Sequence, residues 1–264
     1  MRSSSLKPAS EFSPVPLRLL RVLRLAFHLV RGLLKVSIGF PRWTAARRAR
    51  EIRRWSRELF ALLAIRLDVP HAPVLAPGGT MFVLNHVSWL DIFLLDAVLP
   101  VTFVAKSEIG RWPLVGTLVT RAGTLYIERG SKSAARRTSA RVADALRDGR
   151  PIAIFPEGTT SHGESVQRFH AALFQPAVDT ASTIVPAVLR YRDPHGRLTH
   201  AAAYVGDDSL IKSIWMIVSQ RRMSARLEFL GPMNAQGGDR RTLAERSRAE
   251  IAAALESMES RMPD

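Results

Sequence analysis

The chain is 264 residues long, 47% hydrophobic and free of cysteine, and its formal net charge is +15. This length and apolar content allow one sizeable core, and the lack of cysteine excludes disulfides and thiolate metal sites. The charge is unevenly distributed, because residues 1–66 hold 15 Lys and Arg against 3 acidic residues whereas residues 67–264 hold 23 against 20. The basic excess therefore belongs to the first quarter of the chain.

The chain opens with residues 1–14, whose serine run and two prolines predict a disordered leader. A helix is expected next, in which cations recur every three or four residues among aliphatic side chains. This pattern is typical of a helix lying in a membrane interface, with arginines on anionic head groups and an apolar face toward the acyl chains. The alternative is an ordinary amphipathic helix packed on the domain. The cations are Arg18, Arg21, Arg24, His28, Arg31 and Lys35.

This first helix is not expected to span a bilayer, since no stretch between its cations exceeds six residues and a spanning helix needs about 20 apolar ones. A second helix is expected at residues 44–67, with arginines in its first half and an apolar run in its second. Its arginines would extend the contact with an anionic surface, each contributing roughly 1 kcal/mol near lipid. Residues 15–69 are therefore expected to be an amphipathic basic helix pair that associates with a membrane.

Beyond residue 70 the chain alternates short apolar runs with helical patterns, notably residues 134–147 and a last helix opened by the capping-box sequence Thr242-Leu243-Ala244-Glu245. This alternation predicts an α/β fold, with a mainly parallel mixed sheet flanked by helices and a site at the strand ends. The expected strands are residues 81–84, 102–105, 124–127, 152–155, 184–189, 202–205 and 225–230.

The string Asn85-His86-Val87-Ser88-Trp89-Leu90-Asp91 offers an imidazole and a carboxylate five positions apart. Mid-helix, this spacing would splay the two side chains. If His86 lies in a strand-to-helix turn and Asp91 in the first helical turn, the carboxylate can fold back to one ring nitrogen and leave the other free as a general base. Alone the pair is a weak signal, and a capping Asp beside a turn His is the plainer interpretation.

A second string, Phe155-Pro156-Glu157-Gly158-Thr159, follows about 70 residues later. It predicts a strand end that runs into a tight turn, where Gly158 lets the backbone approach a ligand and Glu157 can accept hydrogen bonds from a hydroxyl or amine. Alone it would be an ordinary turn after a buried strand.

These strings occur in an order that resembles the glycerolipid acyltransferases of the 1-acylglycerol-3-phosphate type. The family signature Asn-His-x4-Asp is matched by Asn85, His86 and Asp91, and its third motif by residues 155–159. Further matches, covering about residues 80–190 in all, are Lys106-Ser107-Glu108-Ile109 with Pro113 and Gly116, Gly123-Thr124-Leu125-Tyr126-Ile127-Glu128-Arg129, and Ile184-Val185-Pro186-Ala187-Val188.

The resemblance implies that residues 70–264 are an acyltransferase domain, with His86 as general base and Asp91 as its orienting partner. Lys106, Arg129, Glu157, Gly158 and Thr159 are expected to bind substrate. Acyl carrier protein or coenzyme A would supply the acyl group as a thioester, with no cofactor and no metal. The expected location is monotopic, at the cytoplasmic face of the inner membrane.

One departure concerns the acceptor, because Thr160 stands where the third motif usually has an arginine thought to hold the acceptor phosphate. A threonine hydroxyl cannot supply that charge. Lyso-ornithine lipid acyltransferases, whose acceptor lacks phosphate, resemble this variant more closely. The expected acceptor is 1-acylglycerol-3-phosphate, giving phosphatidic acid, with lyso-ornithine lipid as the alternative. A nucleic-acid- or lipid-binding protein without catalysis is the alternative of another class, and it would explain the basic first quarter alone.

Overall fold

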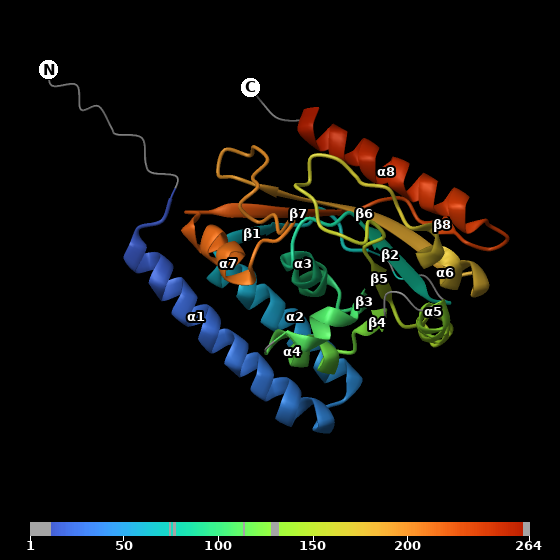
Figure 1. The fold of residues 1–264 in the computed structure, drawn as a ribbon, viewed down its shortest axis with the longest axis horizontal. Helices are drawn as coiled ribbons and strands as arrows, with labels where there is room; N and C mark the ends of the chain where they lie inside the picture. Colours follow the sequence, from blue (N-terminus) through green and yellow to red (C-terminus); the bar gives the residue numbers. More distant parts are fainter. Residues whose placement is uncertain (1–11, 74, 76–77, 113, 128–131, 261–264) are drawn as a thin grey trace, which may run out of the picture.

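The computed structural model describes residues 12–73, 75, 78–112, 114–127 and 132–260, and it has the expected α/β architecture (Figure 1). Its mixed sheet has the strand order β1-β7-β6-β2-β5-β3-β4, and β8 pairs with β6. Pairing is parallel except where β6 meets β7 and β8. The strands are β1 Ile65–Asp68, β2 Thr80–Leu84, β3 Thr102–Lys106, β4 Leu125–Ile127, β5 Ile152–Ile154, β6 Thr183–Arg192, β7 Met223–Phe229 and β8 Met233–Asn234.

The helices form a layer on each face of the sheet (Figure 1). The alternation of side chains along β2 shows the two layers: Phe82 and Leu84 enter a core shared with α1, α2, α3 and α7, whereas Met81 and Val83 enter one shared with α5, α6 and α8. The helices are α1 Val15–Leu34, α2 Ala45–Leu62, α3 Leu90–Val98, α4 Val115–Arg121, α5 Lys132–Arg147, α6 Gln175–Asp179, α7 Leu210–Ser219 and α8 Arg240–Ser260, with short helical turns η1 Lys35–Gly39, η2 Phe40–Arg42, η3 Ser107–Arg111 and η4 Ala171–Phe174.

The first helix is amphipathic as expected, but the prediction that its cations face lipid is wrong for most of them. Arg21 is buried and donates to the carbonyl oxygens of Val218 and Gln220, at 3.0 and 2.6 Å. Further along, His28 stacks on Trp55 of α2, and the remaining cations of the stripe except Arg24 also contact protein groups. These contacts include ion pairs of Arg31 with Glu58 and of Lys35 with Glu51. Most of the charged stripe of α1 therefore faces the protein, whereas Arg24 is exposed and Arg18 is half-buried beside Trp215. The apolar stripe faces outward.

The boundaries of the first 69 residues also differ from the expectation. Of the predicted leader, residues 1–11 lie outside the described residues, but Phe12 forms a bridge with Gln220 and Ser13 is buried. The second helix ends at Leu62 rather than continuing to residue 67, because the backbone turns at Ala64 with a φ of 57°. Residues 65–68 then form β1 at the edge of the sheet. The helix pair is thus continuous with the core and is not a separate unit.

Two further expectations are wrong. Residues 202–205 form no strand. The segment begins in a turn, where the Ala203 N–H bonds the His200 carbonyl, and the Tyr204 N–H then bonds the Val87 carbonyl at 3.0 Å. This segment therefore covers the turn that carries His86. The last helix begins at Arg240, where the Asp239 carboxylate caps the N–H groups of Arg241 and Thr242. Asp239, and not the Thr242 capping box, is the helix cap.

Candidate active site

The parallel pairing of β2, β5, β3 and β4 brings their carboxyl ends to one edge of the sheet. Val83 lies opposite Ile154 in the β2–β5 register, so the residues that follow the two strands emerge side by side. His86 follows β2, Glu157 follows β5, and Lys106 ends β3. Open α/β sheets bind their ligands at this edge. The two sequence strings thus meet in space, as expected.

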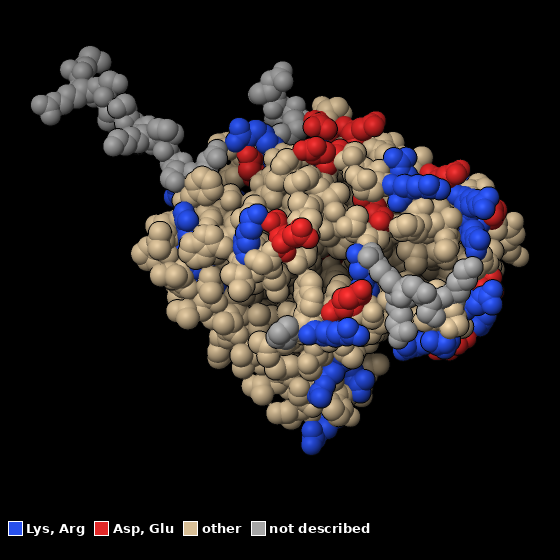
Figure 2. Space-filling view, viewed as in Figure 1, with Lys and Arg blue, Asp and Glu red and all other residues tan. Residues whose placement is uncertain are grey.

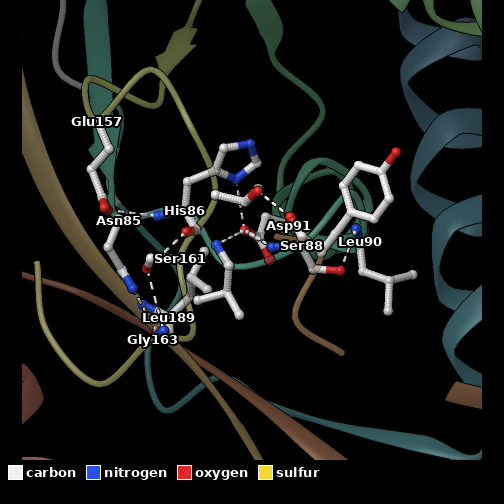
Figure 3. A network of polar contacts seen from close by, with 12 residues as sticks. Asn85, His86, Ser88, Leu90, Asp91, Glu157, Ser161, Gly163 and Leu189 are labelled. Carbon is white, nitrogen blue, oxygen red and sulfur yellow. Dashed lines mark hydrogen bonds and ion pairs between the residues drawn. The ribbon is translucent and has the colours of Figure 1, made fainter. Parts of the chain in front are cut away.

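His86 and Asp91 are in direct contact across the turn between β2 and α3 (Figure 3). His86 Nδ1 lies 2.8 Å from Asp91 Oδ2, and that oxygen also accepts the backbone N–H groups of Val87 at 2.7 Å and Ser88 at 2.9 Å. The same carboxylate thus closes the turn that precedes α3 and orients the imidazole. His86 Nε2 lies on the opposite side of the ring, away from the network (Figure 3). The predicted fold-back of the carboxylate is confirmed.

A tyrosine that the motifs did not indicate completes this network. Tyr191, on β6, is fully buried and donates its hydroxyl to Asp91 Oδ1 at 2.8 Å. Burial raises the pKa of this hydroxyl well above its usual value, and the Asp91 charge adds to the effect, so the hydroxyl keeps its proton and remains a donor. Asp91 therefore receives hydrogen bonds on both carboxylate oxygens. The only sequence signal was the continuation of the apolar β6 run past residue 189.

Asn85 fixes the start of the turn. Its side-chain amide donates to the Leu189 carbonyl at 3.1 Å and accepts the Leu189 N–H at 2.9 Å, so it extends the β2–β6 ladder beyond the end of β2. Because the group is fully buried, losing either bond would leave a polar atom unsatisfied. Asn85 thus holds the backbone from which His86 projects.

Phe155 covers one face of the imidazole. The two rings are stacked, with centroids 4.0 Å apart and planes at 16°. Phe103, on β3, lies parallel to Phe155 with a centroid distance of 6.2 Å. An aromatic stack therefore leads from His86 toward the core beneath α3.

The Glu157 carboxylate joins the two motifs through the backbone. Oε1 accepts the N–H of His86 at 2.9 Å, and Oε2 accepts the N–H of Gln167 at 3.2 Å. Burial raises the pKa of Glu157, and the two backbone hydrogen bonds oppose this rise. The contacts that Glu157 makes are thus internal, and a contact with substrate stays a prediction.

The chain turns tightly after Glu157, with Gly158 at a φ of 69°, a conformation that side-chain-bearing residues adopt at a cost. The following residues line a polar pocket, defined by Thr159, Thr160, Ser161, His162, Gly163, Glu164, Ser165, Gln167 and Val205. Thr159 is exposed in it, whereas the Thr160 hydroxyl donates to the Tyr204 carbonyl. Among these lining residues there is no Lys or Arg. The predicted ligand Arg129 lies outside the described residues.

Comparison with known proteins gives the same assignment as this geometry. The model of the family described as Acyltransferase matches residues 63–190. A lyso-ornithine lipid O-acyltransferase of Pseudomonas aeruginosa is 36% identical over 250 residues, which cover 88% of this chain and 94% of the relative. A 1-acyl-sn-glycerol-3-phosphate acyltransferase of Neisseria meningitidis is 35% identical over 242 residues, covering 90% and 93%.

The chain belongs to the acyltransferase family. It is an enzyme that acts on lysolipids, and both types of acceptor occur among its relatives' names. The crystal structure of the 1-acyl-sn-glycerophosphate acyltransferase PlsC from Thermotoga maritima has the same fold, with a TM-score of 0.71 at 18% identity over 95% of this chain and 98% of that one.

The acyltransferase also has an apolar pocket between the N-terminal helices α1 and α2 and the sheet. Residues of α1, η1, α2, α3, β3 and α4 line it, and Phe103 connects its wall to the aromatic stack on His86. Burial raises the pKa of Asp96, which also lines this pocket, to about 8. The apolar lining includes Val36, Ile52, Ile92, Phe93, Phe103 and Leu118.

Proposed function

We propose that this acyltransferase moves a fatty acyl group from a thioester of acyl carrier protein or coenzyme A to the free hydroxyl of a lysolipid at a membrane surface. The observation that carries this proposal is the contact of His86 Nδ1 with Asp91, which leaves Nε2 for the acceptor. Asp91 favours the tautomer with a proton on Nδ1, so Nε2 has a lone pair for the hydroxyl proton.

In the proposed reaction the acceptor hydroxyl gives its proton to His86 Nε2 while its oxygen bonds to the thioester carbonyl carbon. The tetrahedral oxyanion then re-forms the carbonyl, the carbon–sulfur bond breaks, and the thiolate takes the proton from the imidazolium. Asp91 stabilises the charged ring between these two steps. No covalent acyl-enzyme is required, because the acceptor oxygen is itself the nucleophile.

The first candidate acceptor is 1-acylglycerol-3-phosphate, which would give phosphatidic acid. Lys106, at the same sheet edge as His86, and Arg129 would bind its phosphate, and Gly158 and Thr159 would contact its head group beside Glu157. The relative from Neisseria meningitidis carries the name of this activity.

The second candidate acceptor is lyso-ornithine lipid, which the polar pocket favours. Its lining residues include no Lys or Arg, and the Thr160 hydroxyl already bonds Tyr204. The carboxylate of Glu164 also lines it, with one oxygen 3.0 Å from His200 Nε2. Such a lining suits a head group with an ammonium better than a phosphate dianion. The relative from Pseudomonas aeruginosa carries the name of this activity.

Membrane association is proposed on the outward face of α1. Leu23 and Phe27 are each 69% exposed, and the apolar residues one turn before and after them are exposed as well. A row of this kind exceeds the single apolar residues that ordinary surfaces scatter. Among the described residues, no helix is long and apolar enough to cross a membrane. We propose that α1 lies in the interface of the cytoplasmic leaflet and that the apolar pocket receives an acyl chain from there.

The deciding experiment compares the purified wild-type enzyme and His86→Ala with both lysolipids and both thioester donors. Wild type should acylate at least one acceptor, and His86→Ala should lose activity by three orders of magnitude or more. His170→Ala, at an exposed histidine beside Gly158, is the matched control. Full activity of His86→Ala would exclude the proposed base, and absence of transfer by wild type to either lysolipid would exclude both acceptors.

A further inference from the structure

The short helix α7 presents an apolar face that the proposed reaction does not use. Ile211 is 81% exposed and Trp215, one turn later, is 41% exposed. Residues four apart lie on the same side of a helix. On the opposite side Ser213 and Ile217 are buried, so α7 is amphipathic. Its outer side is apolar apart from the exposed Lys212, which pairs with Asp208.

This face is continuous with the outward face of α1. The two helices pack together, and the Arg18 guanidinium of α1 lies 5.9 Å from the Trp215 ring centroid. Arg21 bonds the carbonyl oxygens at the C-terminus of α7, and Ser13 N–H bonds the Ser219 carbonyl at 2.8 Å. In Figure 2 the flank over α1 is mostly uncharged, whereas charged side chains gather elsewhere on the view. α1 and α7 thus form one rigid surface.

The chemistry of this surface suits a lipid interface. A tryptophan beside an arginine is typical of the depth at which acyl chains meet head groups. Two more arginines, Arg221 and Arg222, are exposed just beyond the end of α7 and can reach anionic head groups. The apolar residues exposed along α1 and α7 are Val15, Leu17, Leu19, Leu20, Leu23, Phe27, Val30, Leu34, Ile211 and Trp215.

α7 is also tied to the catalytic turn. Ser213, on its inner side, accepts a hydrogen bond of 3.0 Å from Trp89 Nε1, and Trp89 lies between Ser88 and the first residue of α3. An enzyme that contacts the membrane along one helix can still rotate about the axis of that helix. A second contact beside the first removes this freedom and fixes the height of the site above the membrane.

We propose that α7 is a second lipid-contacting element, with Ile211 and Trp215 inserted into the bilayer interface beside α1, and that it sets the orientation of the active site on the membrane. This inference rests on the proposed membrane association of α1.

The test uses the full chain and vesicles of anionic and zwitterionic phospholipid that contain lysolipid acceptor. The double variant Ile211→Ser/Trp215→Ser should bind vesicles about tenfold more weakly. Its ratio of activity on vesicles to activity on detergent-micelle acceptor should also fall, because a micelle does not impose one orientation. Leu75→Ser removes an apolar side chain that is 44% exposed outside both helices and should leave both measurements unchanged. The conservative pair Ile211→Leu/Trp215→Phe should restore them.

A second measurement is independent of activity. Brominated lipids in the vesicles should quench the tryptophan fluorescence of wild type, and Trp215→Phe should lose part of that quenching. Unchanged binding and unchanged quenching in these variants would overturn the role of α7. So would a lipid-free dimer that the double serine variant converts to a monomer, since a second copy would then cover the face.

The α1 variant Leu23→Ser/Phe27→Ser separates the two proposals. If it abolishes vesicle binding while the α7 variants bind as wild type, only the inference about α7 fails. If neither set of variants changes binding, the membrane association itself fails.

Discussion

The hydroxyl of Tyr191 lies 2.8 Å from Asp91 Oδ1, on the side of the carboxylate that His86 does not use. Asp91 is fully buried, and burying a carboxylate is costly unless its oxygens are hydrogen-bonded. Tyr191 supplies the bond that the turn itself cannot, because the backbone N–H groups of Val87 and Ser88 both bond Oδ2. A strand 100 residues away in sequence thus fixes the carboxylate that contacts His86.

Tyr191→Phe should therefore act through Asp91. We expect kcat to fall roughly 10- to 100-fold with little change in KM, since a hydrogen bond to a charged group contributes about 1.5–3 kcal/mol. If Tyr191 only stabilises the fold, Tyr191→Phe should lower the melting temperature and leave the pH–rate profile in place. If Tyr191 positions Asp91, the variant should also shift the ascending limb of that profile. Tyr126→Phe, which removes the hydroxyl that bonds Thr120, is the control and should leave the profile in place.

Asp91→Asn should separate charge from geometry. An asparagine can keep its oxygen toward the N–H groups of Val87 and Ser88 and place its amide toward Tyr191, so the fold should survive. The imidazolium formed during transfer would lose its counter-charge, and kcat should fall by about three to four orders of magnitude. Steady-state kinetics with circular dichroism check this expectation. Activity within tenfold of wild type would show that the carboxylate only holds the turn before α3.

Thr160→Arg should change acceptor preference. A guanidinium in the polar pocket would pair with a phosphate dianion, so the ratio of kcat/KM for 1-acylglycerol-3-phosphate to that for lyso-ornithine lipid should rise about tenfold or more. Thr160→Val removes the hydroxyl that bonds Tyr204 without adding charge, and it controls for the lost hydrogen bond. If both variants shift the ratio equally, the charge of the pocket does not determine acceptor preference.

Asp96 should make the stability of the enzyme fall with rising pH. Its pKa is raised by burial from 3.8 to about 8, so the folded protein keeps a proton that the unfolded chain loses. Stability is therefore unaffected below about pH 4 and decreases progressively from there toward about pH 8. Asp96→Asn keeps the oxygen that accepts the Val101 N–H and removes the titration.

The melting temperature of Asp96→Asn minus that of wild type should grow between about pH 5 and pH 8. Asp148→Asn, at an exposed carboxylate paired with Arg150, should give a constant difference. Parallel melting curves for Asp96→Asn and wild type would contradict the raised pKa.

Much of the sheet could be predicted because its strands are short apolar runs bounded by turn residues, and because motif order places His86 and Glu157 at parallel strand ends. The orientation of α1 could not. A stripe of cations at helical spacing fixes two faces but does not say which one packs inward. The acids that receive them, Glu51 and Glu58, lie one after the other at a seven-residue spacing on α2, and that spacing was the available signal.

Other differences have the same origin in tertiary contacts. The sequence predicts the residues of β1 as the end of a helix, because four residues give no reliable period and no residue type marks the turn at Ala64. Residues 202–205 have the apolar character of a strand, but Ala202 and Ala203 are buried where this segment covers the turn that carries His86, not in a sheet. Tyr191 belongs to none of the motifs, and its partner Asp91 follows the turn after a different strand, β2.

The ring of Phe155 against His86 bears on a competing reaction. Any base able to deprotonate an alcohol can also deprotonate water, and attack by hydroxide would waste the activated thioester. The phenyl ring covers one face of the imidazole and leaves the edge bearing Nε2 as the route for a proton donor. In the proposed reaction, Phe155 would thus reduce the water in contact with the base and favour transfer to the acceptor over hydrolysis.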